Sequence, residues 1–287
     1  MQELKQPTYI RQRYVLALLN QIEDDGIQMT YLQKIVFLNE KVSRSSYYDF
    51  IPYKYGPYSF QLAEDIETLC RNGQIYRDEK GFHARIPSEF GVIFSIPKER
   101  GKDLVRRAYR EYPYYAMNSV ILGELFSKEE IGRFQNNKMF QNNVPGLYTI
   151  GYEGKSLESF INILINNDIK VLCDVRKNPL SRKFGFSKSK LEHVLPSVNI
   201  VYISIPELGI ESEKRADLST DAAYKVLFDD YRNNINKKEL FLRKLYDIYK
   251  DNKKIALMCY EKDSKMCHRH IIRDVLVERY GVRSVDL

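Results

Sequence analysis

The chain has 287 residues, of which 44% are hydrophobic and 29% are charged, and this composition excludes a largely disordered protein. Its length suits two globular domains. No apolar run approaches the roughly 20 residues that span a bilayer, and the first residues lack the apolar segment of a signal peptide, so we expect no membrane contact and a cytoplasmic location. Four scattered cysteines are too few for a disulfide framework, and we expect reduced thiols.

The formal net charge of +7 is distributed unevenly. Residues 145–287 contain 25 basic and 20 acidic residues, a net charge of +5, which leaves +2 for residues 1–144. Between Asp174 and Glu192 no acidic residue occurs, and the basic residues there are Arg176, Lys177, Arg182, Lys183, Lys188 and Lys190. Such a segment suits phosphate binding, although a solvated surface can have the same composition.

Residues 1–144 are predicted to form a mainly helical domain. Apolar periodicity predicts helices over 10–22, 30–41 and 60–70, followed by two short strands around Glu79-Lys80-Gly81. This order indicates a winged-helix-like domain, a class that binds DNA or mediates protein contacts. More helix is expected within 100–135, and the polar run 135–143 is the predicted linker.

Two phrases of this part, LQKIVFLNEK and YKYGPYSFQLAEDIETLCRNGQI, resemble the antitoxin-like SocA and Panacea group of small helical domains. The resemblance covers roughly residues 10–85, and Tyr55-Gly56-Pro57 is its most specific part.

Residues 145–287 are predicted to form an α/β domain with an open, mainly parallel sheet and helices on both faces. Short apolar runs alternate there with helical patterns, as in parallel sheets that are covered on both sides. Strands are predicted over 147–150, 170–175, 200–205, 254–259 and 282–285, and helices over 156–166, 187–194, 221–234, 238–250 and 267–280.

The stretch TIGYEGKS, residues 149–156, ends like a nucleotide-binding P-loop. A P-loop has four residues between its two glycines, whereas only two separate Gly151 from Gly154, and this spacing argues against a Walker-type ATPase. A glycine-rich turn between strand and helix can still bind an anion. The alternative is a tight turn in which both glycines have positive φ and Ser156 caps the helix.

Chemically distinctive residues follow four of the predicted strands, and in a parallel sheet the carboxyl ends of the strands form one ligand-binding edge. The candidates for binding substrate or phosphate are Gly151, Gly154, Arg176, Ser181, Arg182, Gly209, Cys267 and Arg269. The candidate catalytic residues are Asp174, Cys259, Glu261 and His268. We expect the arginine forks of Arg176 and Arg182 to hold phosphate, with Asp174 orienting Arg176 or forming a purely structural ion pair with it.

The residues Cys259, Glu261, Cys267 and His268 admit three interpretations. They offer the ligands of a zinc site, but seven residues separate the two cysteines, more than structural zinc pairs usually have, so we expect neither a metal nor another cofactor. Glu261 can instead act as general acid or base with His268 as its partner. The cysteines can also be buried small apolar residues or, with a lowered pKa, nucleophiles.

Three motifs together resemble the family catalogued as domain of unknown function 488: LYTIGYEGKSLESFI, VLCDVRKNPLSRKFGFSKSKLE and ALMCYEKDSKMCHRHIIRDVL. The resemblance runs from about Leu147 to the C-terminus. It implies that the candidate residues other than Gly154, together with Pro179, line one pocket.

We therefore expect an enzyme that acts on a nucleic acid or a nucleotide-like phosphorylated substrate, as a hydrolase or lyase, with DNA favoured over RNA as the partner. One alternative is a non-catalytic DNA-binding or antitoxin-like regulator in a stress or defence locus. Another is a thiol enzyme that uses Cys259 or Cys267.

Overall fold

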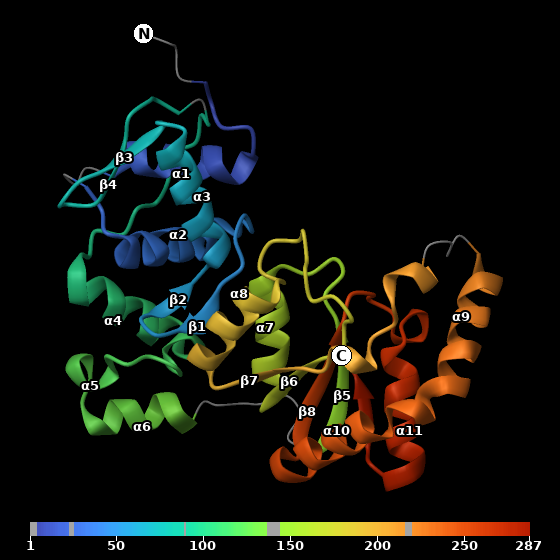
Figure 1. Cartoon of the computed structure of the whole chain (residues 1–287). Helices are drawn as coiled ribbons and strands as arrows, with labels where there is room; N and C mark the ends of the chain where they lie inside the picture. Colours follow the sequence, from blue (N-terminus) through green and yellow to red (C-terminus); the bar gives the residue numbers. More distant parts are fainter. Residues whose placement is uncertain (1–4, 23–25, 89, 137–143, 216–219) are drawn as a thin grey trace. The chain divides into compact units, whose positions relative to one another are not determined.

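The computed structural model describes residues 5–22, 26–88, 90–136, 144–215 and 220–287 (Figure 1). The chain divides into two compact units, residues 1–138 and 139–287. The predicted boundary after residue 144 lies six residues further along. Of the predicted linker, residues 137–143 lie outside the described residues. In the described part of the chain, no helix combines the length and apolar character needed to cross a membrane.

The N-terminal unit is rich in helices and contains the predicted hairpin β3–β4. Its elements, with 3₁₀ helices written η, are α1 (Ile10–Gln21), α2 (Met29–Ser43), β1 (Ile51–Tyr53), β2 (Gly56–Tyr58), α3 (Phe60–Arg71), β3 (Ile75–Arg77), β4 (Phe82–Ala84), α4 (Gly101–Glu111), η1 (Pro113–Ala116), α5 (Leu122–Leu125) and α6 (Lys128–Asn136). The hairpin β1–β2 was not predicted, because its aromatic composition hides the turn that Gly56 makes with φ of 101°. The elements expected of a winged-helix-like domain are present, and assignment to that class stays a prediction.

The C-terminal unit has the alternating strands and helices that the sequence predicts. Its elements are β5 (Gly146–Gly151), α7 (Leu157–Asn166), β6 (Val171–Asp174), α8 (Lys188–Val194), η2 (Leu195–Val198), β7 (Val201–Ser204), η3 (Pro206–Leu208), η4 (Ser212–Arg215), α9 (Asp221–Asn234), η5 (Ile235–Lys238), α10 (Glu239–Asn252), β8 (Lys254–Cys259), η6 (Ser264–Met266), α11 (Arg269–Tyr280) and β9 (Ser284–Asp286).

The five strands form one parallel sheet in the order β7-β6-β8-β5-β9. All residues of β5, β6 and β8 are buried, which explains why these strands are continuous apolar runs without alternation. The predicted α/β class is confirmed.

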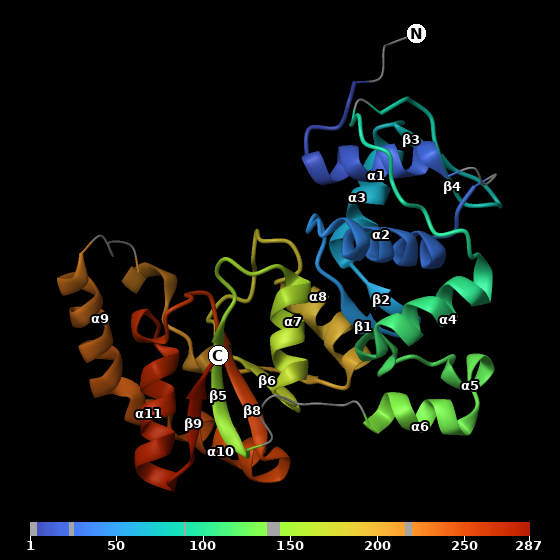
Figure 2. The ribbon, with the colours of Figure 1, turned by 180° about the vertical axis from the view of Figure 1, so that it is seen from behind.

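Helices cover both faces of this sheet (Figures 1 and 2). On one face, Leu147, Ile255 and Leu257 share a hydrophobic core with residues of α9, α10 and α11. Figures 1 and 2 show α7 and α8 on the opposite face. α7 begins where Oγ of Ser156 accepts a hydrogen bond from the backbone N–H of Ser159, so the predicted N-cap is confirmed.

A buried lysine lies in α2 of the N-terminal unit. Lys34 is 1% exposed, and burial lowers its pKa from 10.5 to about 7. The unfolded chain therefore binds more protons than the folded chain between about pH 7 and pH 10.5. Lys34 thus makes the N-terminal unit more stable as pH rises through this range, and below pH 7 the full cost of burying its charge is present.

We predict that Lys34→Met stabilises the N-terminal unit by about 2 kcal/mol or more at pH 6 and by much less at pH 10, because methionine removes the buried charge. Urea unfolding of the full chain at both pH values measures this difference. Lys41→Met, an exposed position on the same helix, should change stability by no more than about 0.5 kcal/mol. Equal destabilisation by Lys34→Met at both pH values would contradict the prediction.

Candidate functional site at the carboxyl ends of the strands

The sheet contains a point where neighbouring connections leave in opposite directions. β8 lies between β5 and β6. The loops after β5 and β6 lead to α7 and α8 on one face, whereas the loop after β8 leads to α11 on the other face (Figure 1). In open parallel sheets, the crevice at such a point is the usual ligand site. Gly151 and Cys259, two of the predicted site residues, are register partners at this edge.

Asp174 and Arg176 form a buried ion pair at the end of β6. Nη2 of Arg176 lies 2.6 Å from Oδ2 of Asp174, and Nε donates to Oδ1 and Oδ2 at 2.9 and 3.1 Å. The Tyr202 hydroxyl donates to Oδ2 at 2.6 Å. Asp174 is 0% and Arg176 6% exposed, so removing either partner would leave an uncompensated buried charge.

The same arginine connects the loop after β6 to the loop after β5. Its Nη1 donates to the Phe186 carbonyl at 2.9 Å and to the Tyr152 hydroxyl at 3.0 Å. The rings of Tyr152 and Phe186 stack with centroids 4.4 Å apart. Burial alone would lower the pKa of Arg176, but the hydrogen bonds to Asp174 raise it. Arg176 is thus permanently charged and holds the two loops together. Its predicted contact with phosphate stays a prediction.

The loop between β6 and α8 contains three further residues of the predicted site, Pro179, Ser181 and Arg182. The backbone N–H of Lys188 donates to the Pro179 carbonyl at 3.0 Å, which closes the loop. Oγ of Ser181 accepts from the Lys183 N–H at 3.1 Å. Arg182 is exposed near the tip, and within the described residues no group forms a hydrogen bond or ion pair with its guanidinium.

Two lysines converge on the end of β5. Nζ of Lys155 donates to the Gly151 carbonyl at 2.9 Å, and Nζ of Lys183 donates to the adjacent Tyr152 carbonyl at 2.8 Å. Burial lowers the pKa of Lys155, and the positive charges of Lys262, Arg269 and Lys183 lower it further. Burial also lowers the pKa of Lys183. These positively charged side chains repel one another, and an anion that binds between them would reduce this repulsion.

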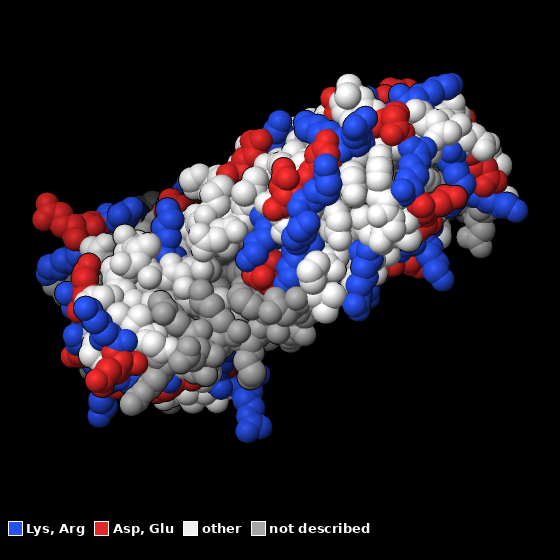
Figure 3. Space-filling view, turned by 90° about the horizontal axis from the view of Figure 1, so that it is seen from below, with Lys and Arg blue, Asp and Glu red and all other residues white. Residues whose placement is uncertain are grey.

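Figure 3 views the molecule from below, and on this face Lys and Arg side chains are interspersed with Asp and Glu side chains. Tyr152 and Lys155 were not predicted as site residues. The sequence Gly154-Lys155-Ser156 contains a signal for Lys155, because it matches the end of a P-loop, but the spacing of the preceding glycines does not fit that motif.

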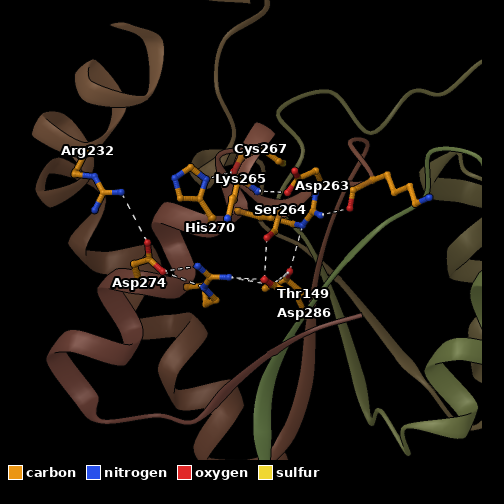
Figure 4. A network of polar contacts seen from close by, with 12 residues as sticks. Thr149, Arg232, Asp263, Ser264, Lys265, Cys267, His270, Asp274 and Asp286 are labelled. Carbon is orange, nitrogen blue, oxygen red and sulfur yellow. Dashed lines mark hydrogen bonds and ion pairs between the residues drawn. The ribbon is translucent and has the colours of Figure 1, made fainter. Parts of the chain in front are cut away.

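Arg269 holds the loop that follows β8. It is 1% exposed and donates to the carbonyl of Glu261 at 2.6 Å, to the carbonyl of Lys262 at 3.0 Å and to Oγ1 of Thr149 at 3.3 Å. Figure 4 shows Thr149 and Ser264 pointing toward Asp286, which accepts hydrogen bonds from both. The guanidinium of Arg269 therefore donates its hydrogen bonds to acceptors within the protein. Its predicted contact with substrate stays a prediction.

The predicted glycines have different roles. A Cβ at Gly151 would lie 1.8 Å from the Glu261 carbonyl oxygen, and a Cβ at Gly209 would lie 2.2 Å from the Lys177 nitrogen. Both positions let a neighbouring loop approach the backbone closely. Gly154 has φ of 74° as predicted, whereas the expectation of positive φ at Gly151 was wrong, because close approach and not turn geometry requires glycine there.

Cys259, Cys267 and His268 form a buried cluster, each no more than 2% exposed. Nδ1 of His268 lies 3.9 Å from the Cys259 sulfur and 3.8 Å from the Cys267 sulfur. Nε2 lies 3.0 Å from the Val175 carbonyl oxygen. Burial raises the pKa of Cys267 well above its ordinary value, and the neighbouring Cys259 thiol and the charge of Glu261 raise it further. This works against the thiol-enzyme alternative for Cys267, because the thiolate is the nucleophile.

Glu261 connects the cluster to the basic edge. Its carbonyl is held by Arg269, its backbone packs on Gly151, and its carboxylate acts electrostatically on Cys267. Oxygen Oε2 of the carboxylate is buried. The predicted partnership of Glu261 with His268 stays a prediction.

The fold and this edge define an open, parallel α/β domain with basic side chains gathered at the strand ends. Residues 156–276 match the family model described as Domain of unknown function DUF488, so the C-terminal unit carries a DUF488 domain, as the sequence motifs predict. The resemblance of residues 10–85 to antitoxin-like domains stays a prediction. No curated protein and no solved structure matches the chain.

We predict that Gly151→Ala destabilises the C-terminal unit by about 3 kcal/mol, because backbone atoms of Glu261 occupy the space of the added methyl group. Gly154→Asn is the control, since it adds a side chain in open space and asparagine tolerates positive φ; we expect a loss of about 1 kcal/mol or less. Urea unfolding of the full chain measures both. Wild-type stability of Gly151→Ala would show that the 261–262 backbone does not pack on β5.

Proposed function

We propose that the C-terminal unit is an enzyme acting on a nucleic acid or another phosphorylated substrate, which binds in the crevice between the loops after β5, β6 and β8. The observation that supports this most directly is the convergence of Lys155 and Lys183 on adjacent carbonyl oxygens. A phosphate group placed there would gain charge-assisted hydrogen bonds from both ammonium groups.

In this proposal, three kinds of residue act on the substrate. Lys155 and Lys183 bind phosphate, and the exposed Arg182 at the loop tip contacts a neighbouring phosphate or base. Glu261 moves a proton as general acid or base. The pair of Asp174 and Arg176 positions Tyr152 and the loop after β6 without touching substrate.

The N-terminal unit would bring the enzyme to its target. A helix-rich unit with a β-hairpin is compatible with DNA recognition, and we favour DNA over RNA. We also propose a cytoplasmic location. No disulfide links the four cysteines, all of which are described, and this agrees with a reducing compartment.

We predict that Lys155→Met and Lys183→Met each weaken binding of a single-stranded DNA oligonucleotide about tenfold, because each removes one charge-assisted contact. Each should also reduce the slope of log affinity against log salt by about 1. Lys170→Met is the matched control, since this lysine lies at the opposite edge of the sheet, paired with Asp168. Unchanged affinity in both variants would refute the proposed phosphate site.

We also predict a pH dependence of this binding. Because the pKa of Lys155 is lowered, its ammonium loses its proton at a lower pH than an ordinary lysine, and affinity falls as pH rises through that lowered pKa. Lys155→Arg stays charged and should make this fall smaller, with the remaining fall due to Lys183, whose pKa is also lowered by burial. Fluorescence anisotropy between pH 6 and pH 10 measures it, and identical profiles for the two proteins would contradict the assignment.

We predict that Glu261→Gln abolishes turnover while it retains binding. Single- and double-stranded DNA and RNA oligonucleotides are incubated with each protein and compared by mass spectrometry, which would also identify the reaction. Glu278→Gln, an exposed carboxylate on α11, is the control and should keep wild-type turnover. If the wild type binds oligonucleotides and leaves every mass unchanged, the result favours the non-catalytic, antitoxin-like regulator instead.

A further inference from the structure

The buried cluster of Cys259, Cys267 and His268 has a geometry that thiol packing alone does not explain. The three candidate ligand atoms, two sulfurs and Nδ1, all lie within 4.8 Å of one another. They come from three different positions of the fold: the last residue of β8, the residue after η6, and the residue before α11. A strand, a loop and a helix therefore supply the cluster together.

The hydrogen bond on the far side of the imidazole fixes which nitrogen faces the sulfurs. A carbonyl oxygen can only accept, so Nε2 of His268 must donate its N–H to the Val175 carbonyl at 3.0 Å. The lone pair of the neutral ring then lies on Nδ1, directed toward the two sulfurs. A histidine that donates its other N–H to a backbone carbonyl is the arrangement that orients metal-binding imidazoles.

The distances from Nδ1 to the two sulfurs also suit a metal. One lone pair on Nδ1 accepts one S–H well, yet the two sulfurs lie at nearly equal distances, 3.9 and 3.8 Å. A tetrahedral zinc ion with bonds of about 2.3 Å to sulfur and 2.0 Å to nitrogen places such ligands roughly 3.5 Å apart. A contraction of a few tenths of an ångström would bring both distances from Nδ1 to sulfur to this value.

We propose that Cys259, Cys267 and His268 bind a zinc ion through their two sulfur atoms and Nδ1. Two thiolates neutralise the charge of Zn²⁺, which makes full burial of the site acceptable. The long spacing between the cysteines is no obstacle, because residues 260–266 fold back over Gly151 and return the chain to the end of β8. This site is independent of the proposed phosphate contacts.

The test is the metal content and zinc affinity of the full-length protein, purified under reducing conditions without chelator. We expect about one zinc ion per chain by plasma mass spectrometry. After the metal is stripped, added zinc should bind again and raise the melting temperature. Cobalt substituted for zinc should give the intense absorption of thiolate-to-cobalt charge transfer, which reports the sulfur ligands directly.

Cys259→Ser, Cys267→Ser and His268→Gln should each weaken zinc binding by about 100-fold or more. Cys173→Ser is the matched control, since Cys173 is equally buried in the neighbouring strand β6 and lies outside the cluster; it should keep the zinc. If the ligand variants do not fold, the cobalt spectrum of the wild type still decides the question.

Two outcomes would overturn the proposal. The first is a folded, reduced wild-type protein that binds neither added zinc nor cobalt. The second is a disulfide between Cys259 and Cys267 that mass spectrometry detects in protein whose metal content stays zero after reduction and zinc addition, which would make the cluster a redox pair.

Discussion

The C-terminal edge of the sheet depends on the buried ion pair between Asp174 and Arg176. Arg176 and the Tyr202 hydroxyl both donate hydrogen bonds to the Asp174 carboxylate. The guanidinium of Arg176 also donates to Tyr152 and Phe186. Separating Arg176 from Asp174 would leave charges unpaired in a nearly water-free environment, at a cost of several kcal/mol. The paired guanidinium is therefore held in place, and its hydrogen bonds to Tyr152 and Phe186 fix the loops after β5 and β6 relative to each other.

The strands and helices of the C-terminal unit were predictable because parallel strands buried on both faces leave a strong apolar signal between helical patterns. The edge at which the site lies followed from the same pattern, since strand ends in a parallel sheet meet on one side. Local chemistry was equally visible at Ser156, whose cap needs only its own helix. Features that depend only on one or two neighbouring residues can therefore be predicted from the sequence.

The roles of individual cations were not predictable. Arg176 and Arg269 have the residue type and position of phosphate ligands, yet their donors meet the carbonyl oxygens of Phe186, Glu261 and Lys262. Backbone acceptors leave no trace in a sequence, because every residue has one. The requirement for Gly151 arises in the same way, from a loop more than 100 residues away in the chain. Spacing rules for cysteine ligands describe compact loops, so they did not indicate the proposed zinc site, whose two cysteines lie at the end of a strand and just before a helix.

The closed loop between β6 and α8 has a consequence for the speed and entropy of recognition. A hydrogen bond from Lys188 to Pro179 closes its residues 179–188, and Arg176 donates to the carbonyl of Phe186 within it. Arg182 is thus presented by a backbone that is already ordered, so a ligand would have to immobilise one side chain and not a whole segment. Encounter with an anionic partner would then need no slow rearrangement, and long-range attraction, screened by salt, would govern how fast the complex forms.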